Sequence, residues 1–293
     1  MLLRCLLLLL AGSAHAKPQL TWLQTDWPPH QIVNGPFQGQ GTFDLLQQQI
    51  MAALPQFTHD TRLVSLARLE QIFQQPDAAS CALGTLYSEE RAQSRLFSVP
   101  MAVGPAVAVG YIAGKLTTHP AMQPEGADIR MLALDKTIRG AFQPNRLYPD
   151  VIAPLLQHPD SNLSSHAFTS EINAAGLLAG NRVDYVVEYP ERMQYYNQLL
   201  PEAAALEHRA IVGANVASVS YVTCSQDSIG QAAIEAIDQV LPVLWQSTEY
   251  LQAMQRWLDS SAQRRLSTDL QQLQQQTLMQ LKPGPDDAVD TGH

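Results

Sequence analysis

The sequence predicts an α/β protein built from two units, each a mostly parallel sheet with flanking helices. Between residues 19 and 86 the chain reads as strand, helix, strand, helix, strand, an order typical of a parallel sheet. A second α/β set follows Pro100, and a β-rich stretch at 214–224 precedes three helical segments. These late segments are expected to complete the first unit, which gives two lobes joined by two crossings of the chain.

The elements of the first unit follow from the spacing of apolar residues. Residues 19–25 alternate as in a buried strand, and "DWPPH" stops them. Apolar residues recur at helical spacing from Phe43 to Leu54, and Pro55 marks the end of that helix. We expect the remaining elements as a strand at 61–66, a helix at 66–73 and a strand at 80–86.

The second unit and the C-terminal region divide in the same way. We expect its strands at 106–113, 129–134 and 183–188, and its helices from near Ile138 and through 191–200. The C-terminal helical segments have apolar faces that start at Ile229, in "TEYLQAMQRWL" and at Leu266, and Pro242 is expected to kink the first.

The first sixteen residues predict a cleaved secretory signal, with Lys17 as the new N-terminus. Arg4 precedes the apolar run 6–10, and Ala14-His15-Ala16 has the small-x-small cleavage pattern. The run is far shorter than the roughly 20 residues that span a bilayer. Ser13 stands where bacterial lipoproteins carry a cysteine, so no lipid anchor is expected. The mature chain is therefore expected to be a soluble periplasmic protein.

Composition excludes several classes of function. The formal net charge is −9, only 15% of residues are charged, and no basic cluster is present, which argues against nucleic acid or an anionic membrane as partner. The eight histidines are scattered, and the common zinc, phosphate-loop and hydrolase motifs are absent. We expect neither a metal nor a cofactor. The tail 283–293 has no apolar face and is expected to be disordered.

Three stretches, in order, carry a resemblance to a known family. They are "DWPPHQIVNGPFQGQGTFDLLQQQI" (26–50), "LYSEERAQSRLFSVP" (86–100) and "LLAGNRVDYVVEYP" (177–190). The first has an aromatic-x-Pro turn, a Gly loop and an acidic helix start. The second has an Arg and Phe-Ser-x-Pro, and the third has a Gly turn before an Asp-containing strand. Over nearly the whole mature length, the chain resembles bacterial extracellular solute-binding proteins of family 3, as a divergent branch.

The resemblance implies a type II periplasmic-binding-protein-like fold. Lobe 1 would contain residues 17–100 and 213–282, lobe 2 would contain 101–212, and the hinges would lie near Pro100 and Val212. A monomer would bind a small polar solute, an amino acid or a small carboxylate, between the lobes for uptake by an ABC permease. The alternatives are a ligand sensor that works with a membrane protein, and an enzyme of the cyclohexadienyl dehydratase kind with an acidic catalyst such as Glu188 or Asp184.

The resemblance also assigns ligand-binding residues in lobe 1. The position of Arg91 is that of an arginine that pairs with the ligand's α-carboxylate, as a planar guanidinium suits a planar carboxylate. Thr85 is the polar residue before it, and Trp27 falls where a ligand-stacking aromatic lies, although a core tryptophan is the alternative. Asp26 would bind an ammonium group or cap the turn, and Arg68 would face the cleft or the solvent.

The assignments in lobe 2 depend on weaker spacing. Glu188 lies one position short of the family's acidic residue for the α-ammonium. Thr137 and Arg139 are expected to begin a helix whose free N–H groups bind an anion. Arg95 is expected on the surface. The strand before Arg91 carries Ala82, Leu83 and Gly84 where the family often has hydroxyl residues, which puts an ordinary amino-acid ligand in doubt.

Once Cys5 leaves with the signal, the mature chain keeps Cys81 and Cys224. In the resembling family the segment that ends at Cys224 rejoins the sheet of the first lobe beside the strand of Cys81. A disulfide between them is expected in an oxidising compartment, where it would tie the two crossings together at their base. Two separate buried thiols are the alternative.

Overall fold

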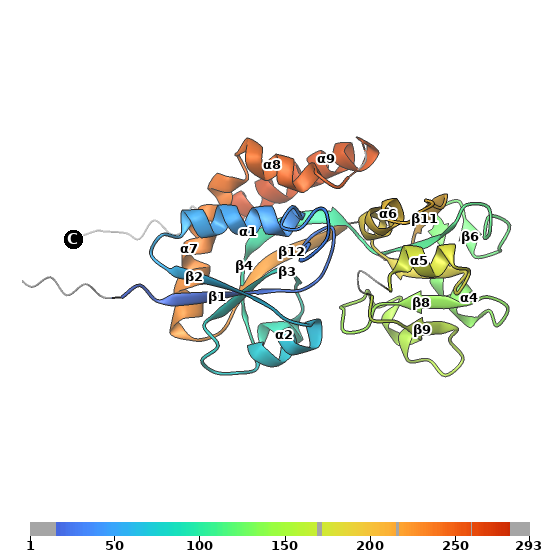
Figure 1. The fold of residues 1–293 in the computed structure, drawn as a ribbon, viewed down its shortest axis with the longest axis horizontal. Coiled ribbons are helices and arrows are strands. Elements are labelled where there is room, and N and C mark those ends of the chain that lie inside the picture. Colours follow the sequence, from blue (N-terminus) through green and yellow to red (C-terminus); the bar gives the residue numbers. More distant parts are fainter. Residues whose placement is uncertain (1–15, 169–171, 215–216, 259, 282–293) are drawn as a thin grey trace, which may run out of the picture.

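A computed structural model gives the fold of the chain, and residues 16–168, 172–214, 217–258 and 260–281 are described. Two lobes lie side by side, each with its own sheet, and the chain passes between them twice (Figure 1). The signal segment up to His15 and the tail 283–293 lie outside the described residues. Among the described helices, none is long and apolar enough to cross a membrane.

The sheet of lobe 1 has the strand order β2-β1-β3-β12-β4. Its strands are β1 (Gln19–Gln24), β2 (Thr58–Leu63), β3 (Ser80–Leu86), β4 (Leu96–Pro105) and β12 (Ala217–Cys224). β1 is parallel to β2 and β3, whereas β12 is antiparallel to both β3 and β4. Four strands therefore run in one direction and β12 runs against them, which confirms that this sheet is mostly parallel and that a late segment completes it.

Helices cover both faces of this sheet. They are α1 (Thr42–Ala53), α2 (Leu66–Phe73), α3 (Glu89–Ala92), α7 (Ser228–Leu244), α8 (Thr248–Gln255) and α9 (Ser260–Leu281). Successive residues of a strand point to opposite faces. Trp22 of β1 packs in the large core with α1, α7, α8 and α9, while Leu23 packs in a smaller core with α2.

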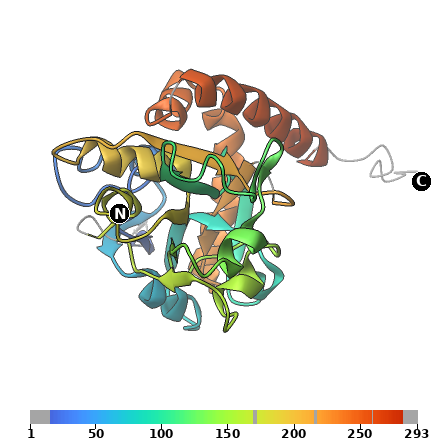
Figure 2. The ribbon, with the colours of Figure 1, turned by 90° about the vertical axis from the view of Figure 1, so that its right-hand side faces the viewer.

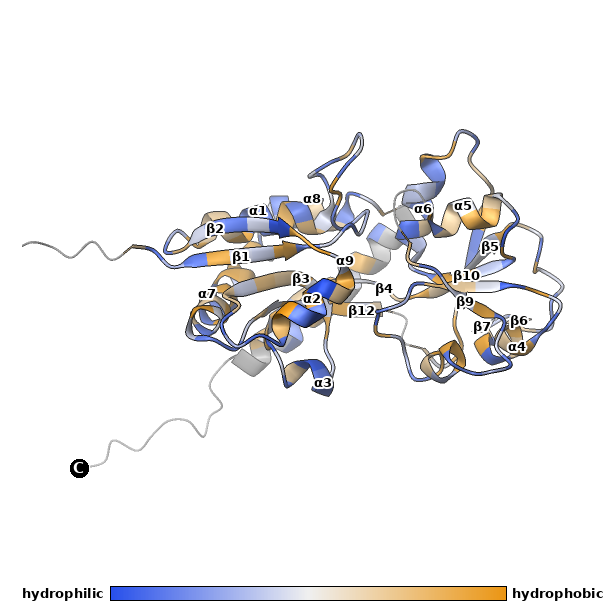
Figure 3. Ribbon diagram, turned by 60° about the horizontal axis from the view of Figure 1, so that its bottom comes forward, coloured by the Kyte–Doolittle hydropathy of each residue, from blue (hydrophilic) through white to orange (hydrophobic). Residues whose placement is uncertain are grey.

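The view from the lobe 2 end shows α8 and α9 along the upper edge of lobe 1 (Figure 2), where α9 packs against the edge strand β4. Coloured by hydropathy, β3 and β12 are largely apolar, whereas α3 is hydrophilic (Figure 3). The distribution fits the burial of the strands: residues 80–85 of β3 are all buried, and no residue of α3 is. The short helix α3 thus lies at the surface of the lobe.

Lobe 2 repeats the arrangement with the strand order β11-β5-β10-β8-β9. Its strands are β5 (Ala108–Ile112), β8 (Gly140–Phe142), β9 (Leu163–Ser165), β10 (Tyr185–Glu188) and β11 (Leu206–Ala210), with a separate ribbon of β6 (Met122–Gln123) and β7 (Gly126–Ala127). Its helices are α4 (Ile129–Leu134), η1 (Ala153–Leu156), α5 (Ala174–Ala179) and α6 (Pro190–Gln198). β5 is antiparallel to both its neighbours, so here too four strands run one way.

The two crossings lie later in the chain than the sequence predicts. Pro100 lies inside β4, opposite Tyr221, and β4 stays paired with β12 as far as Pro105 opposite Ala217. The first crossing therefore follows Pro105, and the return enters the sheet at Ala217. Pro100 is compatible with this position because β4 is an edge strand, where a missing N–H donor is tolerated.

Two predicted elements of lobe 2 are wrong. Residues 129–134, expected as a strand, form α4, because the Asp128 side chain accepts a hydrogen bond from Met131 N and caps the helix. A short apolar run does not by itself distinguish a strand from a buried helix. The helix expected from Ile138 is absent, and the chain there enters β8 at Gly140. Thr137 and Arg139 therefore lie at no helix N-terminus.

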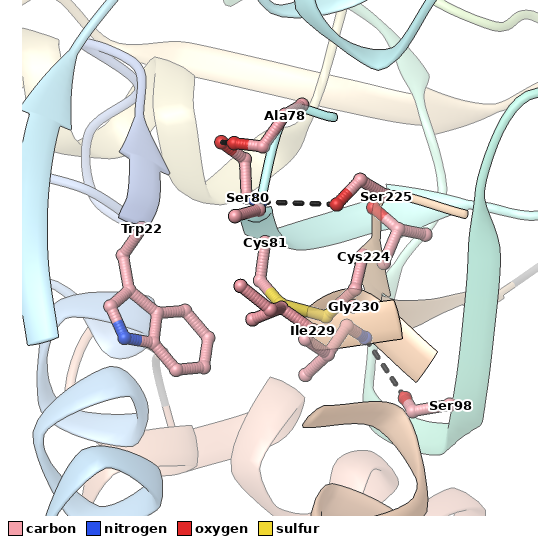
Figure 4. The surroundings of a disulfide bond; sticks show 12 residues. Trp22, Ala78, Ser80, Cys81, Ser98, Cys224, Ser225, Ile229 and Gly230 are labelled. Carbon is pink, nitrogen blue, oxygen red and sulfur yellow. Dashed lines mark hydrogen bonds between the residues drawn. A yellow bond between two sulfur atoms is a disulfide. The ribbon is translucent and has the colours of Figure 1, made fainter. Parts of the chain in front are cut away.

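The expected disulfide is present. Cys81 of β3 and Cys224 of β12 face each other directly in the antiparallel pair, with Cα atoms 4.0 Å apart, and both are fully buried (Figure 4). Ser80 N donates to Ser225 Oγ at 3.1 Å beside the bond. The location differs from the expectation in one respect. Cys224 is at the opposite end of β12 from Ala217, so the disulfide joins two strands within lobe 1 and does not tie the crossings together.

Candidate functional site

A cavity of about 60 Å³ lies between the lobes, and both contribute to its wall. Lobe 1 supplies side chains from β3, α2, α3 and the turn after β1, and lobe 2 supplies the loop after β8 and the residue after β10. The polar and aromatic residues that line it are Thr25, Trp27, Glu70, Thr85, Arg91, Asn145, Arg146 and Tyr189. We call it the arginine cavity. It lies where the strands of both sheets end, the usual place for a ligand in open α/β folds.

Local structure in lobe 1 brings three predicted residues to this cavity. Thr85 is near the end of β3, and its Oγ1 shares a 2.9 Å hydrogen bond with Thr223 Oγ1. Ser88 accepts a hydrogen bond from Arg91 N and so starts α3. Trp27 packs edge-on against Tyr189 of lobe 2, with ring centroids 6.1 Å apart. The sequence predicts that Trp27, Thr85 and Arg91 lie together, and in the structure all three line the lobe 1 wall of the arginine cavity.

Gly84 allows the aromatic residues to approach this strand. Its φ is +83°, and a Cβ atom there would lie 2.4 Å from the Phe43 ring and 3.1 Å from the Trp27 ring. A side chain at this position would be strained by the backbone, would clash with the Phe43 ring and would press on the Trp27 ring. The missing hydroxyl at position 84 is therefore explained by packing.

An arginine–glutamate–arginine group supports the lobe 1 wall. Arg91 donates to Glu70 Oε1 from Nη2 at 3.2 Å and to Leu86 O from Nη1 at 3.1 Å. Arg95 donates to the other Glu70 oxygen and stacks over the Phe73 ring, 4.4 Å from its centroid. Burial lowers the pKa of Arg91, and Glu70 acts in the opposite direction.

Arg95 was expected on the surface, and this expectation is wrong. The residue is only 2% exposed, because it lies under α2 with its charge on Glu70 and its plane on Phe73. A guanidinium is suited to burial of this kind, since it is weakly hydrated and stacks on aromatic faces.

A second arginine–glutamate–arginine group supports the lobe 2 wall. Arg146 binds both oxygens of Glu188, at 2.6 and 3.3 Å, and Arg192 Nε donates to Glu188 Oε2 at 3.3 Å. Burial alone would raise the pKa of Glu188, but the charges of Arg146 and Arg192 outweigh it and lower that pKa. Tyr189 N adds a hydrogen bond of 2.8 Å to the carboxylate. Glu188 itself lies behind Tyr189, is 1% exposed, and does not line the cavity.

The other predicted residues lie away from this cavity. Arg68 is exposed on α2 and bonds Gln71. The exposed Thr137 donates to the half-buried Asp135 side chain, and Arg139 pairs with Asp184 on the outer side of lobe 2.

Asp26, which follows β1, faces a different part of the lobe interface. The pKa of Tyr195 on α6 is raised, first by burial of the Tyr195 side chain and second by the negative charge of Asp26. Asp26 is not among the residues that line the arginine cavity.

Two further cavities adjoin the first, and Leu86 and Tyr189 line all three. The larger one, of about 580 Å³, is rich in tyrosine, and we call it the tyrosine cavity. Its aromatic and charged lining residues are Tyr87, Tyr148, Asp150, Tyr189 and Tyr221. The smaller one, of about 50 Å³, is bounded by Trp27, His30 and Glu191. The space between the lobes thus has a small end lined by two arginines and a wide end lined by tyrosines.

The lobes are held together by direct contacts beside these cavities. Arg192 Nη1 donates to Pro28 O at 3.0 Å, and His30 Nε2 lies 3.3 Å from Glu191 Oε1. Phe37 of lobe 1 packs edge-on against Tyr195 of lobe 2, with ring centroids 6.4 Å apart. In this structure, therefore, lobe 1 and lobe 2 are in direct contact beside the cavities.

Sequence reasoning missed the residues that complete the cavity, namely Glu70, Asn145, Arg146 and Tyr189. Arg146 had a usable signal, since it follows a strand of lobe 2 in the loop "QPNRLYPD", and such loops carry ligand-binding groups. The misplaced helix at Ile138 concealed that strand. Glu70 lies in a correctly predicted helix, but only the fold brings it to Arg91.

No protein-family model and no curated protein matches the sequence. Solved structures do match its fold. An ancestral arginine-binding protein bound to arginine has a TM-score of 0.63 at 16% identity, covering 84% of this chain and 100% of that one. An amino acid ABC transporter substrate-binding protein from Streptococcus pneumoniae, bound to L-arginine, has a TM-score of 0.60 at 18% identity, with 82% and 94% covered.

A histidine kinase sensor domain with similarity to periplasmic binding proteins has a TM-score of 0.61 at 16% identity, covering 83% of this chain and 96% of that one. At these identities the likeness establishes the fold alone. It confirms the two-lobed periplasmic-binding-protein-like fold that the sequence predicts.

Proposed function

We propose that this chain is a periplasmic solute-binding protein that holds a small polar solute, an amino acid or a small carboxylate, between its lobes. The observation that carries the proposal is the arginine cavity, whose wall includes Arg91 and Thr85 of lobe 1 and Arg146 and Tyr189 of lobe 2. A solute that contacts both walls favours the state in which they meet, because it binds that state more tightly. The solute-binding proteins that share the fold support the same function.

Delivery to an ABC permease is the use we propose for the bound solute. The mature chain would begin at Lys17 after cleavage of the signal, carry no lipid and act as a monomer in the periplasm. Residues 17–100 and 213–282 would move as lobe 1, and residues 101–212 as lobe 2. The pairing of β4 with β12 between Pro105 and Ala217 supports lobe boundaries a few residues later in the chain.

A ligand sensor is the second candidate, because a histidine kinase sensor domain shares the fold over 83% of this chain. Deletion of the gene distinguishes the two. A receptor for uptake would reduce accumulation of the labelled solute when lost, whereas a sensor would change the transcriptional response and leave accumulation unaltered.

Binding is proposed over catalysis because the two candidate catalytic acids, Glu188 and Asp184, are both engaged by arginines. Glu188 is bound by two arginines, and Asp184 accepts from Arg139 N at 2.8 Å on the outer side of lobe 2. A general base needs a free carboxylate oxygen within reach of the substrate proton. Neither acid offers one in the arginine cavity.

A thermal-shift screen of the mature protein tests the proposal. Amino acids, small carboxylates and a cell extract are compared, because a solute that binds only the folded state raises the melting temperature. For any compound that binds, Arg91→Ala should weaken binding by roughly 2–5 kcal/mol, as truncation of a buried charge pair does. Arg62→Ala, on the exposed strand β2, is the matched control. No stabilisation by any compound, or an Arg91→Ala affinity equal to the control, would contradict the proposal.

A further inference from the structure

The carboxylate of Glu188 has no acceptor position left for a ligand. Its Oε1 accepts from Arg146 Nη1 at 2.6 Å and from Tyr189 N at 2.8 Å. Its Oε2 accepts from Arg146 Nη2 and Arg192 Nε, both at 3.3 Å. A carboxylate offers about four acceptor positions, and all four are occupied. A ligand ammonium group therefore finds no partner on Glu188, the residue that the sequence resemblance assigns to it.

The charge around the arginine cavity is positive. The charged residues that line the cavity are Arg91, Arg146 and Glu70, a formal sum of +1. With Arg95, Arg192 and Glu188, which complete the two arginine–glutamate–arginine groups behind the walls, the two groups sum to +2. The next acid on α6, Glu191, is directed to His30 and lines the separate smaller cavity. An ammonium group placed here would lose its hydration and meet a net positive field, whereas an anion gains in that field.

Among the described residues, Glu70 is the one carboxylate that lines the cavity, and its charge is already shared by Arg91 and Arg95. Its side chain is 35% exposed, so its Oε1 can leave Arg91 for solvent while its Oε2 stays on the buried Arg95. A ligand carboxylate that replaces its oxygen on Arg91 keeps that guanidinium paired, and the planar fork of the arginine favours a planar carboxylate.

We propose that this cleft selects small carboxylate anions without an ammonium group over zwitterionic amino acids. The inference rests on the proposed function and names the class of solute. The cavity of about 60 Å³ holds the carboxylate. The rest of the solute extends past Leu86 and Tyr189 into the wider tyrosine cavity. Selectivity arises because the described residues that line the arginine cavity offer no free acid for an ammonium group next to the bound carboxylate, as much as from attraction to the anion.

Matched ligand pairs test the selectivity on the unmodified mature protein. Succinate is compared with aspartate, and glutarate with glutamate, by isothermal calorimetry, because each pair differs by one ammonium group. The carboxylate without it should bind at least about tenfold more tightly. Any other compound that binds is compared with its own amino or des-amino counterpart.

Each outcome decides something different. An amino acid that binds as tightly as its des-amino counterpart would overturn the inference and leave the proposed function standing. Inorganic phosphate that binds as tightly as the best carboxylate would overturn the assignment to carboxylates. No binding by any of these compounds, nor by the wider panel, would contradict the proposed function itself.

A substitution of Arg146 tests whether the occupied Glu188 carboxylate and the positive charge cause the selectivity. Arg146→Met removes one positive charge and frees two acceptor positions on Glu188, so affinity for the carboxylate should fall at least about tenfold and the preference over its amino counterpart should narrow. Arg130→Met, at an exposed position of α4, is the control and should leave the ratio unchanged. An unchanged ratio in Arg146→Met would overturn the inference. If that variant fails to fold, Arg146→Lys should give a smaller change in the same direction, since lysine keeps the charge and loses the fork.

Discussion

The two walls of the cleft use the same arrangement of two arginines on one glutamate and differ in burial. In lobe 1 the Glu70 side chain is 35% exposed. In lobe 2 the Glu188 side chain is 1% exposed and the arginines beside it are 7% and 1% exposed. A buried ion can leave its partner only by becoming an uncompensated charge in a medium of low dielectric constant. The lobe 2 group is therefore fixed, whereas Glu70 can exchange Arg91 for water or for a solute.

The lobes also differ in how their sheets are held. The sheet of lobe 1 is cross-linked by Cys81–Cys224 between β3 and β12, and the sequence has no further cysteine after residue 16. The lobe with the exchangeable charge is thus the one with the covalent link. Four expected results, from the largest effect to the smallest, test this division.

Removal of the disulfide should have the largest effect. The bond closes a loop between residues 143 positions apart, for which the chain-entropy model gives a stabilisation of roughly 4–5 kcal/mol. In calorimetry of Cys81→Ala/Cys224→Ala, the transition of lobe 1 should move to lower temperature and that of lobe 2 should move less. Equal shifts for both lobes would contradict the division, and counting thiols in the denatured, unreduced wild type provides the control.

Glu188→Gln should come next. The substitution leaves Arg146 and Arg192 buried without a counter-charge, and breaking a buried pair in this way costs about 3–5 kcal/mol. Urea unfolding measures the change. A loss below about 1 kcal/mol would show that water or another group compensates the two arginines, and that the lobe 2 wall is less fixed than its burial indicates.

Glu70→Gln should cost less, about 1–3 kcal/mol, the range for hydrogen bonds to charged groups. One fully buried arginine, Arg95, loses its counter-charge here, against two in Glu188→Gln. Arg91 retains its bond to Leu86 O, and the carboxylate that is lost was already in contact with solvent. Urea unfolding under the same conditions gives the comparison. A loss as large as that of Glu188→Gln would remove the distinction between an exchangeable and a fixed wall.

The sequence predicts lobe 1 better than lobe 2, and the reason is physical. In lobe 1 the elements are long enough for apolar spacing to be decisive, and the expected bounds of α2 and β3 agree with the structure. In lobe 2 the elements are shorter. The six residues 129–134 have no periodicity that separates a strand from a helix, and the cap at Asp128 decides between them.

The site divides similarly. Arg91 belongs to a contiguous motif and was found, whereas its partner Glu70 lies 21 residues away and the Arg146–Glu188 pair is separated by 42. Pairings across such distances depend on the strand order of the sheets, which local patterns do not specify. In the sequence, Glu188 lies one position short of the acidic residue that the resembling family uses for the α-ammonium group. In the structure, Glu188 is instead paired with Arg146 and Arg192 of its own lobe.

The smallest expected effect compares one helix cap from each lobe. In lobe 1 Asp227 accepts from Ile229 N, Gly230 N and Ala79 N, at 3.0, 2.9 and 2.8 Å, so that it starts α7 and holds the turn before β3. In lobe 2 Asp128 accepts from Met131 N at 2.9 Å. Loss of a cap costs about 1 kcal/mol, and up to about 2 in the strongest cases. Asp227→Ala should therefore lose about 2 kcal/mol and Asp128→Ala about 1.

The pH dependence gives this last comparison a second readout. Burial alone would raise the pKa of Asp227, but its hydrogen bonds from Ser225 and from the three backbone N–H groups outweigh burial and lower that pKa below the ordinary value of 3.8. A carboxyl whose folded pKa is depressed contributes stability that is complete above its unfolded pKa and is lost as the pH falls through the folded one. Urea unfolding of wild type and Asp227→Ala should therefore differ most at pH 6 and converge as the pH falls below about 3.8. A difference that stays constant to low pH would assign the effect of Asp227 to packing, and the cap of lobe 1 would then be no stronger electrostatically than that of lobe 2.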